Sequence, residues 1–196
     1  RRSVWFELFY DLIVVAALVN GCHLIEGRPT VRLGAWLGAT LVVMLVLWVL
    51  TALHANLYQA DDWTGRALIL IQMFSIAISI LAIGRIDESL PDGIGFAALG
   101  VAFLSMSVLY ARSDRSRYRS EARLVIWSSG LAGVILLAGA PFLNSGTTEF
   151  RLAGIPLMEQ LVFAVAALIG CVPVYWTLLG RVVRKGLIDV GRFSER

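Results

Sequence analysis

Charge, cysteine and histidine are all scarce in this chain of 196 residues. Only 16% of the residues are charged, and there are two cysteines and two histidines. Soluble domains carry about 25% charged residues, so this shortage argues against a water-soluble protein. Cys22 and Cys171 both lie inside apolar runs, without the spacing of a metal-binding motif. We therefore expect packed thiols, no metal site and no cofactor.

Apolar residues, by contrast, make up 58% of the chain and give it a mean hydropathy of +0.78. They recur in runs long enough to cross a hydrocarbon core of roughly 30 Å. Only helices and closed barrels satisfy their backbone polar groups in lipid. The sequence therefore predicts a single all-α domain, a polytopic transmembrane helical bundle. Its six predicted helices lie at about 5–25, 33–58, 67–84, 94–111, 124–143 and 152–180.

Basic residues are distributed unevenly between the two predicted sides of this bundle. Of the 17 Lys and Arg residues, all except Arg28, Arg32, Arg85 and Arg151 lie on the side that holds both termini. The positive-inside rule then predicts that both termini of this segment are cytoplasmic. This membrane orientation also explains the Arg-rich loop at 112–123, so the loop gives no reason to expect nucleic acid as a partner. The expected partner is the lipid bilayer.

Two carboxylates, Glu7 and Asp11, lie one helical turn apart inside the first apolar run. An acidic side chain at the bilayer centre costs about 2.5–3.5 kcal/mol on insertion scales, so each needs a partner, water or a shallow position. Glu7 lies in the first two turns, where it can reach the interface and favours the positive helix end. Asp11 is deeper, so we expect its partner in the connection at 61–66 or in the segment at 192–196.

A second group of polar residues ends the second predicted helix and continues beyond it. It contains His54, Asn56, Asp61, Asp62 and Arg66, a density that predicts a hydrogen-bonded junction at the cytoplasmic surface. A simpler interpretation is that the two aspartates cap the following helix, whose first turn favours acids. His54 is then an interfacial histidine and no ligand.

Polar and small residues also recur at helical spacing farther along the chain. Gln72, Ser75 and Ser79 share one face of the third predicted helix, where they either bond helices together or line a hydrated path. Pro156 leaves open a sixth helix that begins only after it. Small residues spaced for close helix packing are Gly34, Gly38, Gly93, Gly100, Ser107, Ser129 and Gly133.

The opening motif Phe6-Glu7-Leu8-Phe9-Tyr10-Asp11-Leu12 resembles the Glu-Leu-Phe-Phe-Asp-Leu signature of the bacterial low-temperature-requirement A (LtrA) family of membrane proteins. Tyr10 stands in place of the usual Phe. The polar group from Asn56 to Arg66 resembles a second landmark of that family, with Gln59 in place of an acid. The resemblance implies a multi-pass protein of the bacterial cytoplasmic (inner) membrane, but no substrate and no catalytic residues.

The last five residues, Arg192-Phe193-Ser194-Glu195-Arg196, are similar to the start of a further conserved block of the family, with Arg192 replacing His. The chain begins at Arg1 with neither methionine nor a signal-peptide layout. We therefore expect trimmed ends, and a missing C-terminal half of the same chain as a partner.

The leading functional hypothesis is a proton- or cation-coupled transporter or channel. Carboxylates inside a membrane are common carriers of protons and cations. The ligand would be a small ion or solute. We predict one charge network toward the cytoplasmic side, made of Glu7, Asp11, Asn56, Asp61, Asp62, Arg66, Gln72, Glu195 and Arg196.

Two alternatives stay open. In a structural, assembly or stress-adaptation protein, the carboxylates pair with arginines to fix helix registry, and nothing is transported. A membrane-embedded enzyme would need acids and histidines that converge on a metal or substrate. His23 lies near the outer end of the first predicted helix and His54 near the inner end of the second, roughly 25–30 Å apart at 1.5 Å per residue. An enzyme is therefore the least favoured of the three.

Overall fold

The computed structural model describes residues 4–27, 31–58, 62–83, 93–112, 119–143, 151–152 and 155–174. Within these ranges the chain is helical apart from one short pair of strands and Asp62, which confirms the all-α fold class. The helices are α1 (Val4–Gly27), α2 (Val31–Tyr58), α3 (Trp63–Ile83), α4 (Gly93–Arg112), α5 (Arg119–Leu143) and α6 (Leu157–Val174).

The start of the last helix differs from the prediction. β1 (Arg151–Leu152) and β2 (Ile155–Pro156) pair antiparallel, and α6 begins only at Leu157. A helix start at about residue 152 is therefore wrong, and the alternative start after Pro156 is confirmed. Pro156 disfavours a helical conformation at Ile155, which precedes it, and supplies no backbone N–H. The predicted continuation over 175–180 lies outside the described residues.

Two other helices begin about a turn earlier than their apolar runs. α3 starts at Trp63 and α5 at Arg119, where the runs predict starts at 67 and 124. Polar residues at a membrane surface can extend a helix beyond its apolar part. Among the described residues, three segments are long and apolar enough to cross a membrane, and they lie in α3, α4 and α5. Shorter apolar stretches lie at Phe9–Asn20, Thr40–Ala55 and Ala164–Pro173.

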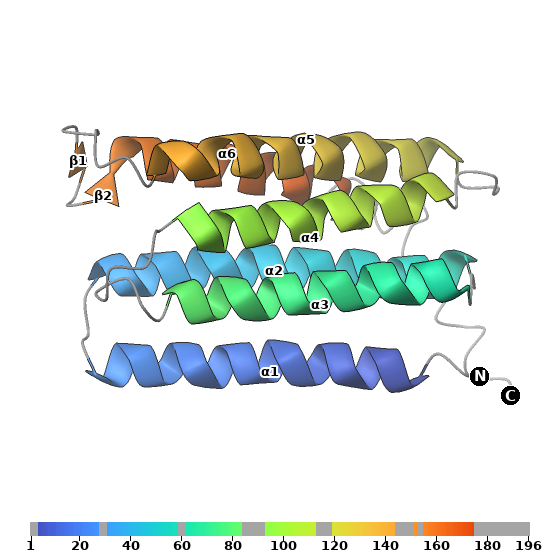
Figure 1. Ribbon diagram of the computed structural model, residues 1–196, viewed down its shortest axis with the longest axis horizontal. Helices are drawn as coiled ribbons and strands as arrows, with labels where there is room; N and C mark the ends of the chain where they lie inside the picture. The colour runs from blue at the N-terminus through green and yellow to red at the C-terminus, as the bar shows by residue number, and fades with distance from the viewer. Residues whose placement is uncertain are drawn as a thin grey trace, which may run out of the picture.

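Consecutive helices run in alternating directions along the long axis of the molecule (Figure 1). α1 lies along one edge, followed by α2 and α3, then α4, and finally α5 and α6. α4 packs between α3 and α5, while α2 contacts α1, α3, α4 and α6. This alternation brings the starts of α1, α3 and α5 to the same end of the bundle as the ends of α2 and α4. We call it the Asp62 end, after the residue that precedes α3.

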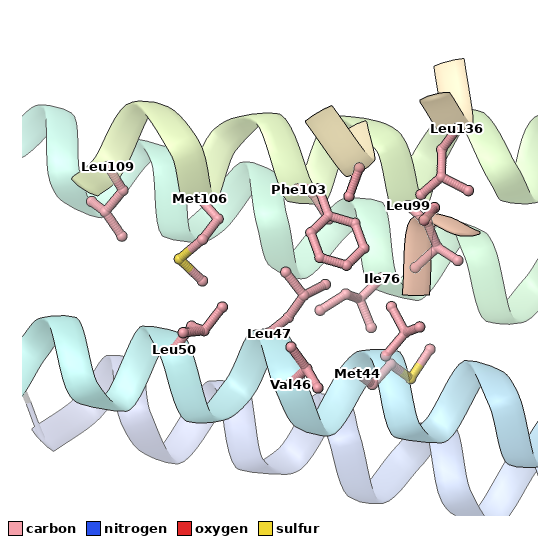
Figure 2. Packing of buried hydrophobic residues seen from close by; sticks show 14 of the residues in the cluster. Met44, Val46, Leu47, Leu50, Ile76, Leu99, Phe103, Met106, Leu109 and Leu136 are labelled. Atoms are coloured by element: carbon pink, nitrogen blue, oxygen red, sulfur yellow. The ribbon is translucent and has the colours of Figure 1, made fainter. Parts of the chain in front are cut away.

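The interface between α2 and α4 is apolar through the middle of the bundle. Leu47 and Leu50 of α2 face Phe103 and Met106 of α4, with Ile76 of α3 beside them (Figure 2). All five side chains are fully buried. Each therefore contributes roughly 1.5–3 kcal/mol relative to an exposed position in water, although lipid offers a smaller gain.

α4 and α5 approach each other through glycine. A Cβ built on Gly100 would lie 3.0 Å from the carbonyl oxygen of Gly133, and one on Gly133 would lie 2.9 Å from that of Gly100. Ser107 adds a hydrogen bond to the carbonyl of Ile126 at 2.9 Å. The predicted packing role of these small residues is therefore confirmed.

Gly34 and Gly38 behave differently from the glycines of α4 and α5. A Cβ built on either of them would meet nothing within 4 Å. Their spacing on α2 therefore makes no close helix contact in the part of the chain that the structure describes.

Candidate functional site: a buried polar seam

Polar side chains gather where α1, α2 and α3 meet, around Thr51 of α2. The Thr51 hydroxyl lies 2.8 Å from the carbonyl oxygen of Leu47 and 3.1 Å from Oε1 of Gln72, and its single hydrogen is shared between these acceptors. The Tyr10 hydroxyl of α1 approaches Thr51 without reaching hydrogen-bond geometry. We call the buried residues Tyr10, Thr51, Gln72, Ser75 and Ser79 the polar seam.

The serines continue the polar seam along α3 toward α4, where a Cβ built on Gly95 would lie 3.9 Å from Oγ of Ser79. Gln72 and Ser79 are seven residues apart, or about 10 Å along the axis at 1.5 Å per residue. Gln72 is 1% exposed and Ser79 is fully buried, whereas Phe74 on the outer face of the same helix is 68% exposed. The polar face of α3 therefore points into the bundle. Both a role in joining helices and a role in lining a hydrated path require this orientation.

Three polar atoms of the seam lack a hydrogen-bond partner among the described residues: the Tyr10 hydroxyl, Gln72 Nε2 and Ser79 Oγ. Thr40 of α2 and Ser129 of α5 carry two further such atoms outside the seam. A buried polar group left unsatisfied costs roughly 1–3 kcal/mol. Buried waters usually satisfy such groups, with 2–4 hydrogen bonds each. The seam therefore leaves polar atoms open to further hydrogen bonds inside an apolar bundle.

Asp11 lies on an exposed side of α1, next to α2. Nε1 of Trp48 donates a hydrogen bond to Oδ1 of Asp11 at 2.6 Å. The sequence places the partner of Asp11 near residues 61–66 or 192–196, but the described partner is this indole. No sequence signal pointed to Trp48, because tryptophan is an ordinary residue of a membrane helix.

Asp62 holds the start of α3 and the end of α4 together. Its Oδ1 accepts the backbone N–H of Gly65 at 3.1 Å, which is the bond of a helix N-cap. Its Oδ2 lies 2.5 Å from Nη2 of Arg112. The Arg112 hydrogen bond holds the pKa of Asp62 below its usual range. The capping interpretation is correct for Asp62, while Arg112 was predicted only as one of many basic residues.

Arg66 lies in the first turn of α3, where its backbone N–H donates to the carbonyl oxygen of Asp62 at 3.2 Å. Other members of the predicted network are less fully described. Glu7 and Asn56 belong to α1 and α2, but their side chains lie outside the described part of the chain. Asp61, Glu195 and Arg196 lie wholly outside it. The meeting of all nine residues in one network therefore stays a prediction.

His54 lies one turn beyond Thr51 on α2 and is only 4% exposed. Its ring packs edge to face against Tyr110 of α4, with centroids 5.2 Å apart and an interplanar angle of 62°. The backbone of Leu109 accepts a hydrogen bond from His54. The Tyr110 hydroxyl donates to the carbonyl oxygen of Leu50 at 2.8 Å. His54 is thus part of the contact between α2 and α4. Its spacing of three residues from Thr51 would have predicted that both side chains lie on the same buried face of α2.

In a comparison with protein families, residues 2–196 match the model described as bacterial low temperature requirement A protein. The chain belongs to the LtrA family. Comparisons with curated proteins and with solved structures give no match. Family membership and the apolar helices together make this LtrA chain a membrane protein.

The outer surface of the LtrA chain agrees with a lipid environment. Large apolar side chains are exposed on the outward faces of several helices, including Phe74, Leu81, Trp127, Leu131 and Leu168. They come from α3, α5 and α6. In water such an exposed surface would favour aggregation. In a bilayer it is the lipid-facing surface, and the polar seam lies behind it.

Proposed function

We propose that this LtrA protein is a proton- or cation-coupled transporter or channel whose polar seam forms part of the path. The observation that carries the proposal is the set of unpartnered buried atoms on Tyr10, Gln72 and Ser79. Polar residues that only join helices hydrogen-bond across the interface. Unpartnered atoms on neighbouring helices instead create positions for water, through which a proton or a small cation can move.

The dimensions of the seam favour the proton. Oγ1 of Thr51 lies 3.1 Å from Oε1 of Gln72, so no solute fits between these two side chains. Hydroxyl groups such as those of Tyr10 and Thr51 both donate and accept hydrogen bonds, and can therefore relay a proton. A larger cation would need the helices to separate at this point. On the distribution of basic residues, we place the Asp62 end in the cytoplasm.

We assign the carrier role to Asp11. An ionisable residue inside a membrane span is a functional candidate because its burial in lipid is costly. The indole of Trp48 orients one of its two carboxylate oxygens. Asp11 follows Tyr10 in α1, so it lies at the depth of the seam, with its side chain on the exposed side of the helix.

The test is proton flux into liposomes that contain the purified full chain. We expect flux above that of empty liposomes, and a loss of at least roughly tenfold in Asp11→Asn, which cannot exchange a proton. Glu26→Gln is the matched control, because Glu26 is an exposed acid of the same helix that pairs with His23 at 3.5 Å. Flux unchanged by Asp11→Asn at every pH would rule out the carrier role.

A structural or assembly role is the second candidate, and the Asp62–Arg112 pair favours it. This pair and the cap on Gly65 fix the ends of two helices without any need for transport. A protein with only this role would leave liposomes no more permeable to protons than empty ones. The wild-type measurement alone therefore distinguishes the two functions.

A further inference from the structure

His54 occupies the position between the Asp62–Arg112 pair and the polar seam. It lies at the Asp62 end of α2, three residues after Thr51, so the two side chains share a face of the helix. Toward α4 its ring meets Tyr110 and the backbone of Leu109. On this face of α2, His54 therefore lies nearer the Asp62 end than Thr51 does.

We propose that His54 is a proton-binding residue that controls entry to the polar seam from the Asp62 end. The inference rests on the proposed transport function and adds a residue to it. Histidine is the side chain whose ordinary pKa puts its charge change between about pH 5 and 8. The hydroxyl and amide groups of the polar seam do not change charge between these pH values. A proton bound at His54 would therefore make entry to the seam depend on pH.

The chemistry needs one proton and no other reactant. One ring N–H of His54 donates to Leu109, and in a neutral imidazole the second nitrogen is an acceptor. Addition of a proton at that nitrogen turns the neutral ring into an imidazolium with two donors. Loss of the same proton restores the neutral ring.

Burial of the His54 ring disfavours the imidazolium most strongly, and its bond to Leu109 and the charged groups at the Asp62 end modify that effect. Asp62 acts on the His54 ring electrostatically and favours the imidazolium. Arg112, bonded to Asp62, opposes it, and Arg66 adds a further positive charge at the start of α3. The Tyr110 hydroxyl is already a donor to Leu50. An imidazolium at His54 would therefore add positive charge near the Asp62–Arg112 pair.

A direct titration tests the proton-binding site without any flux measurement. The chain has two histidines, so His23→Gln leaves His54 as the single histidine signal in NMR spectra of isotope-labelled protein in lipid. We expect this signal to titrate between about pH 4 and 8, and its midpoint to fall by about half a unit or more in Asp62→Asn. A ring that keeps one charge state across this range, or a midpoint indifferent to Asp62, would overturn the proposal.

Flux measurements separate this inference from the function on which it rests. If wild type carries protons, His54→Gln should change the pH profile of flux, with a loss of roughly tenfold at the acid end, while His23→Gln keeps the wild-type profile. Wild-type flux with an identical profile in His54→Gln would overturn the His54 role and leave the transport function standing. Wild-type flux equal to that of empty liposomes would overturn both.

Discussion

The contact between α4 and α5 and the contact among α1, α2 and α3 are built in opposite ways. At the first, Gly100 and Gly133 remove side chains so that backbones touch. At the second, the larger polar side chains of Tyr10, Thr51 and Gln72 fill the space between helices. Close backbone packing leaves no room for water, whereas polar side chains with unpartnered atoms attract it. We therefore propose a tightly packed, dry contact between α4 and α5 and a hydrated contact among α1, α2 and α3.

The comparison predicts different responses to substitution on the two sides. On the dry side, added volume should be costly and should affect stability first. On the hydrated side, removal of polar atoms should leave the fold nearly intact and affect transport.

The largest expected effect is that of Gly100→Ala. The new Cβ would meet backbone atoms of Gly133 and Leu137 at 3.0 and 3.2 Å, so α4 and α5 must move apart. Overpacking of this kind costs about 1–3 kcal/mol. Denaturant unfolding in detergent micelles measures the loss. The control Gly38→Ala has open space and should keep or raise stability, since alanine is favoured over glycine in helices by up to about 1 kcal/mol. Equal effects at both sites would contradict the comparison.

Gly170→Ala should destabilise by about 1–2 kcal/mol because its Cβ would lie 2.7 Å from the buried Phe103 ring. The obstacle is a side chain here, so it can be removed. We expect Gly170→Ala to cost less in a Phe103→Leu background than in wild type, and a double-mutant cycle of unfolding free energies measures this coupling. Strict additivity of the two substitutions would show that α6 does not press on Phe103.

Gln72→Leu should leave the unfolding free energy unchanged or raise it by up to about 1 kcal/mol. The substitution removes the unpartnered Nε2, and Thr51 keeps its bond to Leu47. Proton flux should nevertheless fall, because leucine interrupts the polar seam. Ser105→Ala is the control, since that buried hydroxyl is already bonded to Ala102 of its own helix at 2.7 Å. A marked loss of stability in Gln72→Leu would mean that Gln72 only joins helices.

The smallest effect is expected for Asp62→Asn, which keeps an N-cap residue but removes the charge. Because Arg112 lowers the pKa of Asp62 in the folded protein, the pair stabilises the fold above the ordinary aspartate pKa of about 3.9. That contribution is lost as the pH falls through the lowered pKa. Wild type should therefore lose more stability than Asp62→Asn on acidification below about pH 4. Parallel acid-unfolding curves would show that the pair contributes nothing.

The helices could be predicted from the sequence because long apolar runs have few other stable forms in lipid. The cap formed by Asp62 could be predicted for a similar reason, since it depends only on neighbouring residues. Contacts between distant elements could not. The bonds from Trp48 to Asp11 and from Arg112 to Asp62 join residues 37 and 50 positions apart, and they depend on which helices become neighbours. The start of α6 could not be fixed by hydropathy, which extends the apolar run back to residue 152; the backbone restriction imposed by Pro156 gives the observed start.

The most direct test of the hydrated seam is the transfer of magnetisation from water to the Gln72 side-chain amide, measured by solid-state NMR on the full chain in lipid bilayers. The Leu47 methyl groups, fully buried on the apolar side of α2, supply the dry reference in the same sample. We predict much faster transfer to Gln72 than to Leu47. Transfer to Gln72 as slow as transfer to Leu47 would contradict a hydrated seam and the transport function proposed from it.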